Sequence, residues 1–144
     1  MTIFEQVAAV FTALFLLVVL SYYLLLFLPK KKLPIKRIFS SITVIIPAHN
    51  EGPYLKEAID SVRQALFEGT KQIIVIDDGS IDDTSGIAKQ YKDVMLLQQE
   101  QKGKSASINR ALKEATGELI AIVDGDSVIS KNSLIEMAKE LGRD

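Results

Sequence analysis

The sequence predicts an α/β fold, in which an N-terminal membrane helix precedes a domain built on a mostly parallel sheet. Two observations predict the domain: short β-branched runs alternate with segments of helical periodicity, and acidic residues follow several of those runs. A third observation predicts the membrane helix, because residues 7–28 contain no charged side chain. Strands that alternate with helices along a chain are typical of parallel sheets.

The first 28 residues (1–28) are predicted to form a transmembrane helix. The uncharged run from Val7 to Leu28 would be roughly 33 Å long as a helix, which matches the thickness of a bilayer core. Tyr22 and Tyr23 lie toward one end, where aromatic belts form. The alternatives are a core helix, which would keep a polar face, and a signal peptide, which would begin with basic residues. This segment shows neither feature.

The next segment, residues 29–40, is predicted to be a basic cytoplasmic linker that contains Pro29 and Pro34. Its basic side chains are Lys30, Lys31, Lys32, Lys36 and Arg37. Because basic residues are retained on the cytoplasmic side, we expect a single-pass protein of the cell membrane with its N-terminus outside. The same cluster also fits a patch that binds anionic lipids, which is compatible with this topology.

The domain is expected at residues 41–144 and begins with a buried strand at 42–47 (ITVIIP). Pro53 suits the first turn of a helix, and apolar residues then recur at helical spacing as far as Val62. A second strand is expected at 72–77 (QIIVID).

The second half of the domain continues the alternation. Ser80 and Asp83 have the spacing of a capping box at the start of another helix. The remaining elements are a strand, a helix, a strand and a last helix begun by Ser130 or Ser133, with the first three at 94–97, 105–115 and 119–123. Beyond residue 37, 17 acidic and 12 basic residues leave a charge of −5, so no nucleic-acid partner is expected.

Residues that carry chemistry follow the carboxyl ends of these strands, where parallel sheets bind ligands. Asp77 and Asp78 end the second strand, and Asp124 and Asp126 follow the fourth. Two carboxylates at this spacing can share a divalent cation, which in turn can bridge a diphosphate. Lys104 at a helix start would add positive charge beside the same phosphates. Each motif alone also fits an ordinary turn, helix cap or solvated helix start.

The composition and the motif order exclude other classes. The chain has no cysteine and one histidine, His49, to which no role is assigned, so cysteine sites and multi-histidine metal clusters are excluded. A nicotinamide-binding domain would need G-x-G-x-x-G where residues 47–51 (PAHNE) stand. A receiver domain would place its acidic pair after the first strand, whereas here the pair follows the second.

Four segments carry a resemblance to a known family: ITVIIPAHNE, IIVIDDGSIDDT, KGKSASINRALKEATGE and LIAIVDGDS. Over most of residues 42–127 the sequence resembles family 2 glycosyltransferases, whose catalytic domain has the Rossmann-like GT-A fold. The apolar helix and basic linker ahead of it resemble the N-terminal portion of membrane polysaccharide synthases, which make poly-N-acetylglucosamine, hyaluronan, chitin or cellulose. The resemblance therefore implies the nucleotide-binding half of a GT-A domain.

The resemblance also implies the roles of individual residues. The implied nucleotide-sugar-binding residues are Pro47, Ala48, Glu51, Asp77, Asp78, Lys104 and Asp124. Among them Asp78 would read the uracil ring, Asp77 would support it, and Lys104 would lie near the diphosphate. Asp124 and Asp126 would form the DxD motif that binds Mg²⁺ or Mn²⁺, with Asp126 as the more direct ligand.

The implied reaction is transfer of a sugar, with inversion, from a UDP-sugar to a glycan or lipid-linked acceptor at the membrane. The family's general base lies in an acceptor-binding half beyond the DxD motif, so no catalytic residue is assigned here. We therefore expect a fragment, inactive alone, or one piece of a split enzyme completed by a second chain. Residues 41–144 alone are expected to fold poorly, because a half-sheet exposes an edge and apolar faces. The alternatives are a non-catalytic, membrane-tethered nucleotide-sugar-binding module and a polyprenyl-phosphate sugar transferase.

Overall fold

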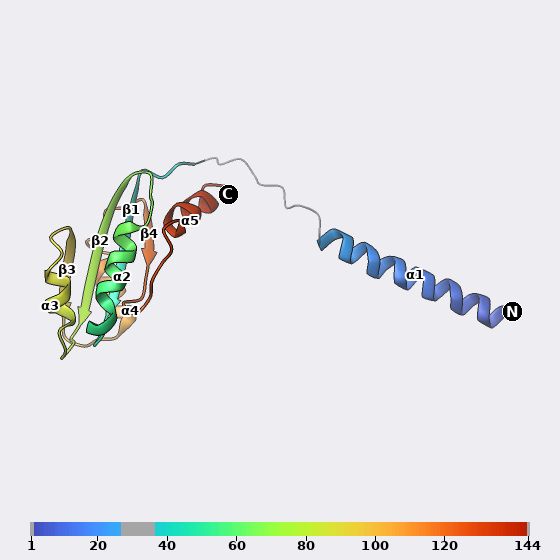
Figure 1. Ribbon diagram of the computed structural model, residues 1–144, viewed down its shortest axis with the longest axis horizontal. Helices are drawn as coiled ribbons and strands as arrows, with labels where there is room; N and C mark the ends of the chain where they lie inside the picture. The colour runs from blue at the N-terminus through green and yellow to red at the C-terminus, as the bar shows by residue number, and fades with distance from the viewer. Residues whose placement is uncertain (1, 27–36, 144) are drawn as a thin grey trace. The chain divides into compact units, whose positions relative to one another are not determined.

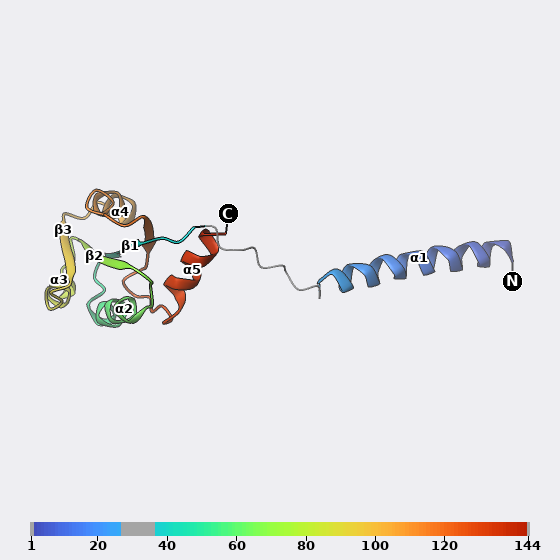
Figure 2. The same cartoon turned by 90° about the horizontal axis from the view of Figure 1, so that it is seen from above.

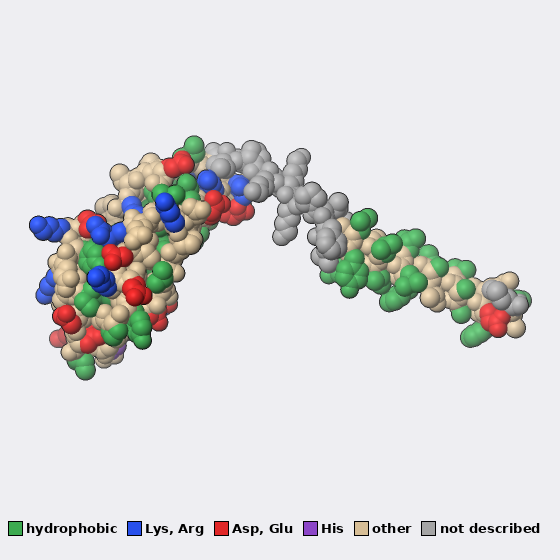
Figure 3. Space-filling model, in the orientation of Figure 1, with side chains coloured by type: hydrophobic (Ala, Val, Ile, Leu, Met, Phe, Trp, Pro, Cys, Tyr) green, Lys and Arg blue, Asp and Glu red, His purple; other side chains and the backbone are tan. Residues whose placement is uncertain are grey.

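A computed structural model describes residues 2–26 and 37–143 of the chain and divides them between two units, each described by itself. The first unit contains helix α1 (Ile3–Leu26), whose one charged residue, Glu5, lies in the first turn (Figure 1). Apolar side chains dominate the surface of α1, whereas acidic and basic side chains are interspersed over the second unit (Figure 3). The helix is long and apolar enough to cross a membrane, and its apolar stretch Ile3–Leu24 is not buried inside the structure.

The hydroxyl groups of Thr12 and Ser21 in α1 are satisfied within the helix. The hydroxyl of Thr12 donates to the carbonyl of Ala8, and the hydroxyl of Ser21 donates to that of Val18. Such bonds remove the need for water around the hydroxyl groups, which suits an apolar solvent. The basic residues used to predict orientation lie, except for Arg37, outside the described residues, so the topology stays a prediction.

The second unit contains a sheet of four parallel strands in the order β3-β2-β1-β4, which confirms the predicted α/β fold. The strands are β1 (Ser41–Ala48), β2 (Thr70–Asp78), β3 (Val94–Gln99) and β4 (Leu119–Ile122). The isoleucine and valine runs of β1 and β2 are buried on both faces, as central strands of parallel sheets are. The register pairs Ala48 with Asp77 and Asp78 with Gln99, so neighbouring strands end at the same edge.

Helices cover both faces of this sheet (Figure 2). One face packs against α2 (Gly52–Gln64), α3 (Thr84–Lys89) and α5 (Ser133–Leu141), and the other against α4 (Lys104–Ala111). The larger apolar cluster contains Leu55 and Ile59 of α2 and Leu134 of α5 against the first face of the sheet. A smaller cluster joins Ala111 of α4 to Ile45 of β1 on the opposite face.

Two local predictions are wrong. The predicted capping box does not form, because Asp83 is the N-cap of α3 without a side-chain cap hydrogen bond, and the Ser80 hydroxyl accepts from the Asn50 N–H instead. Helix α4 ends at Ala111 and not at residue 115. The chain beyond α4 turns against β1, where the N–H of Gly117 donates to the Thr43 hydroxyl at 2.9 Å.

Strand β4 lies at one edge of the described sheet and exposes apolar side chains. Ile120 and Ile122 are 42% and 49% exposed on the face that α4 covers elsewhere. This exposure is the feature from which poor folding of residues 41–144 alone is predicted. That folding behaviour itself stays a prediction.

Lys71 offers a test of how α2 is held above β2. Its ammonium donates to the carbonyls of Val62, Arg63 and Ala65 at 2.7, 2.8 and 2.8 Å, and burial, followed by the nearby charge of Arg63, lowers the pKa of Lys71. Lys71→Met removes these donors from the end of α2 and should lower the free energy of unfolding by about 1–3 kcal/mol in urea titrations of the full chain. Lys56→Met, on an exposed position of the same helix, is the matched control. Equal stability of the two variants would contradict a stabilising role for the three hydrogen bonds of Lys71.

Candidate functional site

A hollow of about 160 Å³ lies at the carboxyl ends of the strands. Its lining residues are Pro47, Ala48, His49, Glu51, Asp78, Lys104, Ser107, Asp124 and Asp126. These include all the predicted site residues except Asp77, although they come from four separate segments of the sequence. The structure also adds His49 and Ser107, for which the sequence analysis assigned no role.

Asp77 and Asp78 have different surroundings, because successive side chains of a strand point to opposite faces of the sheet. The carboxylate of Asp77 turns toward α3, where it accepts hydrogen bonds from the Ser80 N–H at 2.9 Å and from the Ser85 hydroxyl. It therefore shapes the turn after β2 without lining the hollow. The strand period alone indicates that only one of this acidic pair can face α4.

Asp78 anchors the loop between β3 and α4. Its Oδ1 accepts from the Gln99 side chain at 2.6 Å and from the Lys102 N–H at 2.9 Å, and its Oδ2 accepts from the Gly103 N–H at 2.7 Å. Burial acts to raise the pKa of Asp78, but these hydrogen bonds outweigh it and hold the pKa below its ordinary value. A carboxylate has about four acceptor positions, so roughly one remains for a ligand.

Lys104 and Asp124 form an ion pair across the hollow. The ammonium of Lys104 lies 2.5 Å from Oδ1 of Asp124, and this hydrogen bond raises the pKa of Lys104. Both side chains are about half exposed, at 57% and 48%. Exposed pairs of this kind contribute little free energy, so a charged ligand can separate them at low cost.

Glu51 carries the one carboxylate oxygen, among the described residues, that is buried without a hydrogen-bond partner. Burial is the first cause that raises the pKa of Glu51, followed by the charges of Asp126 and Asp124. A Cβ atom at position 125 would lie 1.8 Å from the unpartnered oxygen, so glycine leaves the room that Glu51 occupies. Since buried polar atoms usually have a partner, this oxygen points to a ligand or water in the hollow.

The acidic residues of the hollow fit a divalent cation that takes only a few ligands from the protein and the rest from a bound ligand or water. Among the described residues no three His, Cys, Asp or Glu side chains are close enough to hold a metal ion by themselves. Asp124 and Asp126 supply hard oxygen ligands, and the unpartnered oxygen of Glu51 lies beside them. The hollow has four carboxylates and one lysine, so a diphosphate would meet net negative charge unless a cation accompanied it.

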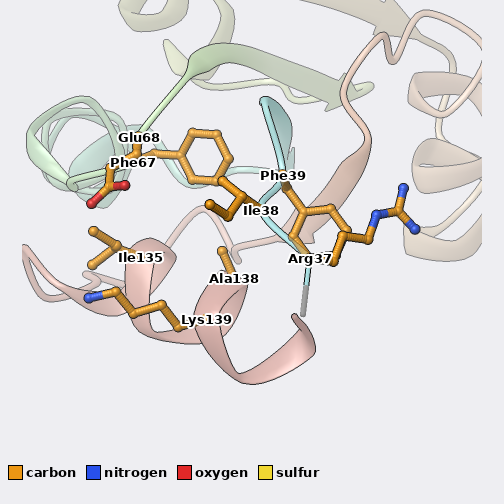
Figure 4. A pocket seen from close by; sticks show the side chains of 8 residues that line it. All are labelled: Arg37, Ile38, Phe39, Phe67, Glu68, Ile135, Ala138 and Lys139. Atoms are coloured by element: carbon orange, nitrogen blue, oxygen red, sulfur yellow. The ribbon is translucent and has the colours of Figure 1, made fainter. Parts of the chain in front are cut away.

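A second hollow, of about 170 Å³, lies at the amino ends of the strands, next to the residues that lead into β1 and β2 (Figure 4). It is lined by Arg37, Ile38, Phe39, Phe67, Glu68, Ile135, Ala138 and Lys139. Figure 4 shows that aromatic and aliphatic side chains make up most of its lining. This second hollow has one carboxylate in its lining, that of Glu68, whereas the hollow at the carboxyl ends has four.

A family model described as "Glycosyl transferase family 2" matches residues 43–144, which include every residue that lines the hollow at the strand ends. The chain belongs to this family. Both the predicted resemblance and the predicted GT-A fold are thereby confirmed.

Individual family 2 relatives agree with this assignment. Glycosyltransferase GlyG of Streptococcus pneumoniae is 34% identical over 98 residues, which cover 65% of this chain and 32% of GlyG. The structure of S. aureus TarS 1–349 in complex with UDP has 32% identity and a TM-score of 0.62 over 68% of this chain and 31% of that one. The mannosyltransferase PcManGT from Pyrobaculum calidifontis, solved with GDP-Man and Mn²⁺, has 26% identity and a TM-score of 0.65 over 96% of this chain and 43% of its own.

This family 2 chain spans about a third of the length of GlyG and of TarS 1–349. The residues that match the family model include the hollow at the carboxyl ends of the strands and nearly all of the parallel sheet. The fold and the family are thus established.

Asp78→Asn tests the anchor beneath the hollow. An asparagine would turn an N–H₂ group toward the N–H groups of Lys102 or Gly103, so we expect a loss of about 2 kcal/mol of unfolding free energy at pH 7. Because folding lowers the pKa of Asp78, its stabilisation is present above the ordinary value of 3.8 and is lost as the pH falls through the folded value. The difference from wild type should therefore shrink in urea titrations below about pH 4.

The matched control is Glu57→Gln, which replaces an exposed carboxylate on α2 by an amide and should match wild type. A difference between Asp78→Asn and wild type that stays constant from pH 7 into the acid range would contradict the account of Asp78.

Proposed function

We propose that this chain carries the donor-binding part of an inverting glycosyltransferase that takes a UDP-sugar with Mg²⁺ or Mn²⁺. The observation that carries the proposal is the convergence of Glu51, Asp78, Lys104, Asp124 and Asp126 on one hollow at the carboxyl edge of the family's sheet. Solved relatives support a nucleotide donor, since TarS is described in complex with UDP and PcManGT in complex with GDP-Man and Mn²⁺.

The uracil ring of the donor would lie against the loops that follow β1 and β2. Pro47 and Ala48 provide apolar backbone at the end of β1, and Asp78 has an acceptor position left for a ring N–H of uracil. Asp77 supports this residue indirectly, because it fixes the turn that follows β2.

The diphosphate would lie between Lys104 and the pair Asp124 and Asp126. Lys104 is the first residue of α4, so its ammonium and the N-terminal end of the helix place positive charge on the same side of the hollow. When bound, a divalent cation would neutralise the charge that develops on the departing diphosphate. Asp126 is the proposed direct ligand, because its carboxylate has no basic partner among the described residues, whereas Asp124 is paired with Lys104.

Transfer would proceed by attack of an acceptor hydroxyl on the anomeric carbon, with UDP as leaving group. A general base must take the acceptor's proton. In this proposal Asp78, Asp124 and Asp126 are engaged by the nucleotide or the cation. The resemblance places Glu51 among the nucleotide-sugar-binding residues, so we assign the general base to residues outside this sequence. They would lie in a longer chain or in a second chain, and the acceptor would be a glycan or a lipid-linked sugar.

The second candidate is a non-catalytic role, because Asp78, Lys104 and Asp126 line a hollow that suits a donor and to which no general base is assigned. Taken alone, the chain would be a membrane-tethered module that binds a nucleotide sugar or a subunit of a split enzyme. Binding of UDP without transfer from any UDP-sugar would favour this second candidate.

Asp126→Ala tests the proposed donor site. In calorimetric titrations of the full chain in detergent, wild type should bind UDP with Mn²⁺ and lose at least tenfold in affinity when EDTA replaces the metal. Asp126→Ala should bind UDP weakly with or without Mn²⁺, because the proposed metal ligand is gone. Glu57→Ala removes an acidic residue of α2 that does not line the hollow and should bind like wild type. A folded wild type that binds no UDP, or an Asp126→Ala variant that keeps the metal dependence, would contradict the proposal.

The proposed anchor places α1 across the cell membrane with the N-terminus outside. The chain has no cysteine, so single cysteines can report topology without background labelling. Thr2→Cys in intact cells should react with a membrane-impermeant thiol reagent, whereas Ser130→Cys, exposed on the domain, should react only after permeabilisation. Labelling of both variants in intact cells, or of neither, would contradict this topology.

A further inference from the structure

His49 lies where three loops meet at the edge of the donor hollow. The loops follow β1, β2 and β3 and span residues 49–51, 79–83 and 100–103. Each loop contains or adjoins one residue of the proposed site. Glu51 lies in the first loop, Asp78 directly precedes the second, and Lys104 directly follows the third. We name this region the three-loop junction.

The imidazole of His49 contacts its own loop, the third loop and the end of β2, where the second loop starts. Its Nδ1 lies 2.9 Å from the carbonyl oxygen of Asp78. Its Nε2 lies 3.1 Å from Nδ2 of Asn50 and 3.2 Å from Nε2 of Gln101. Among the described residues, the contact with Gln101 is the direct hydrogen bond between the first loop and the third.

The surrounding bonds determine the tautomer of His49. The side-chain oxygen of Asn50 accepts from the Ile81 N–H at 2.9 Å, so the NH₂ group of Asn50 must face the imidazole. Nε2 therefore accepts from Asn50, and Nδ1 must carry the proton that it donates to the Asp78 carbonyl. The ring accepts on one side and donates on the other, as a neutral imidazole does.

The first two loops are joined by several other bonds, which leave the third loop dependent on fewer contacts. Asn50 contacts Ser80 and Ile81 of the second loop. Two further bonds join the same segments, from the Glu51 N–H to Thr84 and from the Gly52 N–H to Asp82. The third loop is fixed by the carboxylate of Asp78 and by His49. Loss of the imidazole contacts would thus let Lys104 shift relative to Asp78 and Glu51.

We infer that His49 is a positioning residue of the donor site, whose neutral Nδ1–H form holds the three loops in the arrangement that binds the nucleotide. The inference rests on the proposed function, because it concerns affinity for the same UDP donor. The imidazole acts through the Asp78 carbonyl and the Gln101 side chain, and so sets the separation of the groups that contact base and diphosphate.

The tautomer can be observed directly, because His49 is the one histidine of the chain. Long-range ¹H–¹⁵N correlation spectra of the ¹⁵N-labelled full chain in detergent micelles should show a neutral imidazole protonated at Nδ1 at pH 8. An imidazole protonated at Nε2 would overturn the inference, since Nδ1 could then not donate to the Asp78 carbonyl.

Two substitutions separate the hydrogen bonds from the shape of the ring. His49→Phe keeps a planar ring without polar atoms and should weaken UDP binding about tenfold or more, as the loss of two or three hydrogen bonds would. His49→Asn places an amide N–H₂ near the position of Nδ1 but leaves the contact with Gln101 unmade, so its affinity for UDP should fall between those of wild type and His49→Phe. Gln101→Ala should weaken binding in wild type but add little to His49→Phe, because the two side chains act through one contact.

The outcomes distinguish this inference from the proposed function. If wild type binds UDP and folded His49→Phe binds it equally well, or His49→Asn is as weak as His49→Phe, the positioning role is overturned and the donor site stands. If folded wild type binds no UDP, the proposed function fails and the positioning role fails with it, whatever tautomer the spectra show. Urea titrations of each variant exclude a general loss of folding as the cause.

Discussion

The arrangement of the site depends on a buried carboxylate, that of Asp78, which is stabilised by N–H groups of the loop between β3 and α4. Asp78 ends β2, a central strand whose position is fixed by apolar side chains on both faces. Its bonds to the Lys102 and Gly103 N–H groups set where α4 begins, and hence where Lys104 lies. The side chain of Asp78 thereby fixes the start of α4, and with it Lys104, to a central strand of the sheet.

This constraint explains how a small, strongly acidic hollow can persist. The hydrogen bonds to Asp78 keep its charge at low energetic cost, and Lys104 offsets the charge of Asp124. The negative charges of Glu51 and Asp126 are offset less by nearby positive charge. The pKa of Glu51 is accordingly raised, first by burial and then by the charges of Asp126 and Asp124. A hollow with this balance favours an anionic ligand only in company with a cation, which is the chemistry of a nucleoside diphosphate and a divalent metal.

Much of this arrangement could be predicted from the sequence, because the carboxyl ends of parallel strands meet at one edge. The β-branched runs predicted the strands to within two residues at each end, and the acidic residues that follow them converge as expected. The strand period separates the orientations of Asp77 and Asp78, but the contacts of His49 could not be derived from spacing, because they depend on how the loops pack in three dimensions. Helix α4 is shorter than predicted, because the chain turns early against Thr43 of β1.

The most direct test of this account is a structure of the chain determined with UDP and Mn²⁺. The account predicts the nucleotide in the hollow at the carboxyl edge, with uracil within hydrogen-bonding distance of Asp78 and the metal bound to Asp126 and the diphosphate. UDP bound in the apolar hollow near Phe39 and Phe67, or bound at the carboxyl edge with the metal away from Asp126, would contradict it.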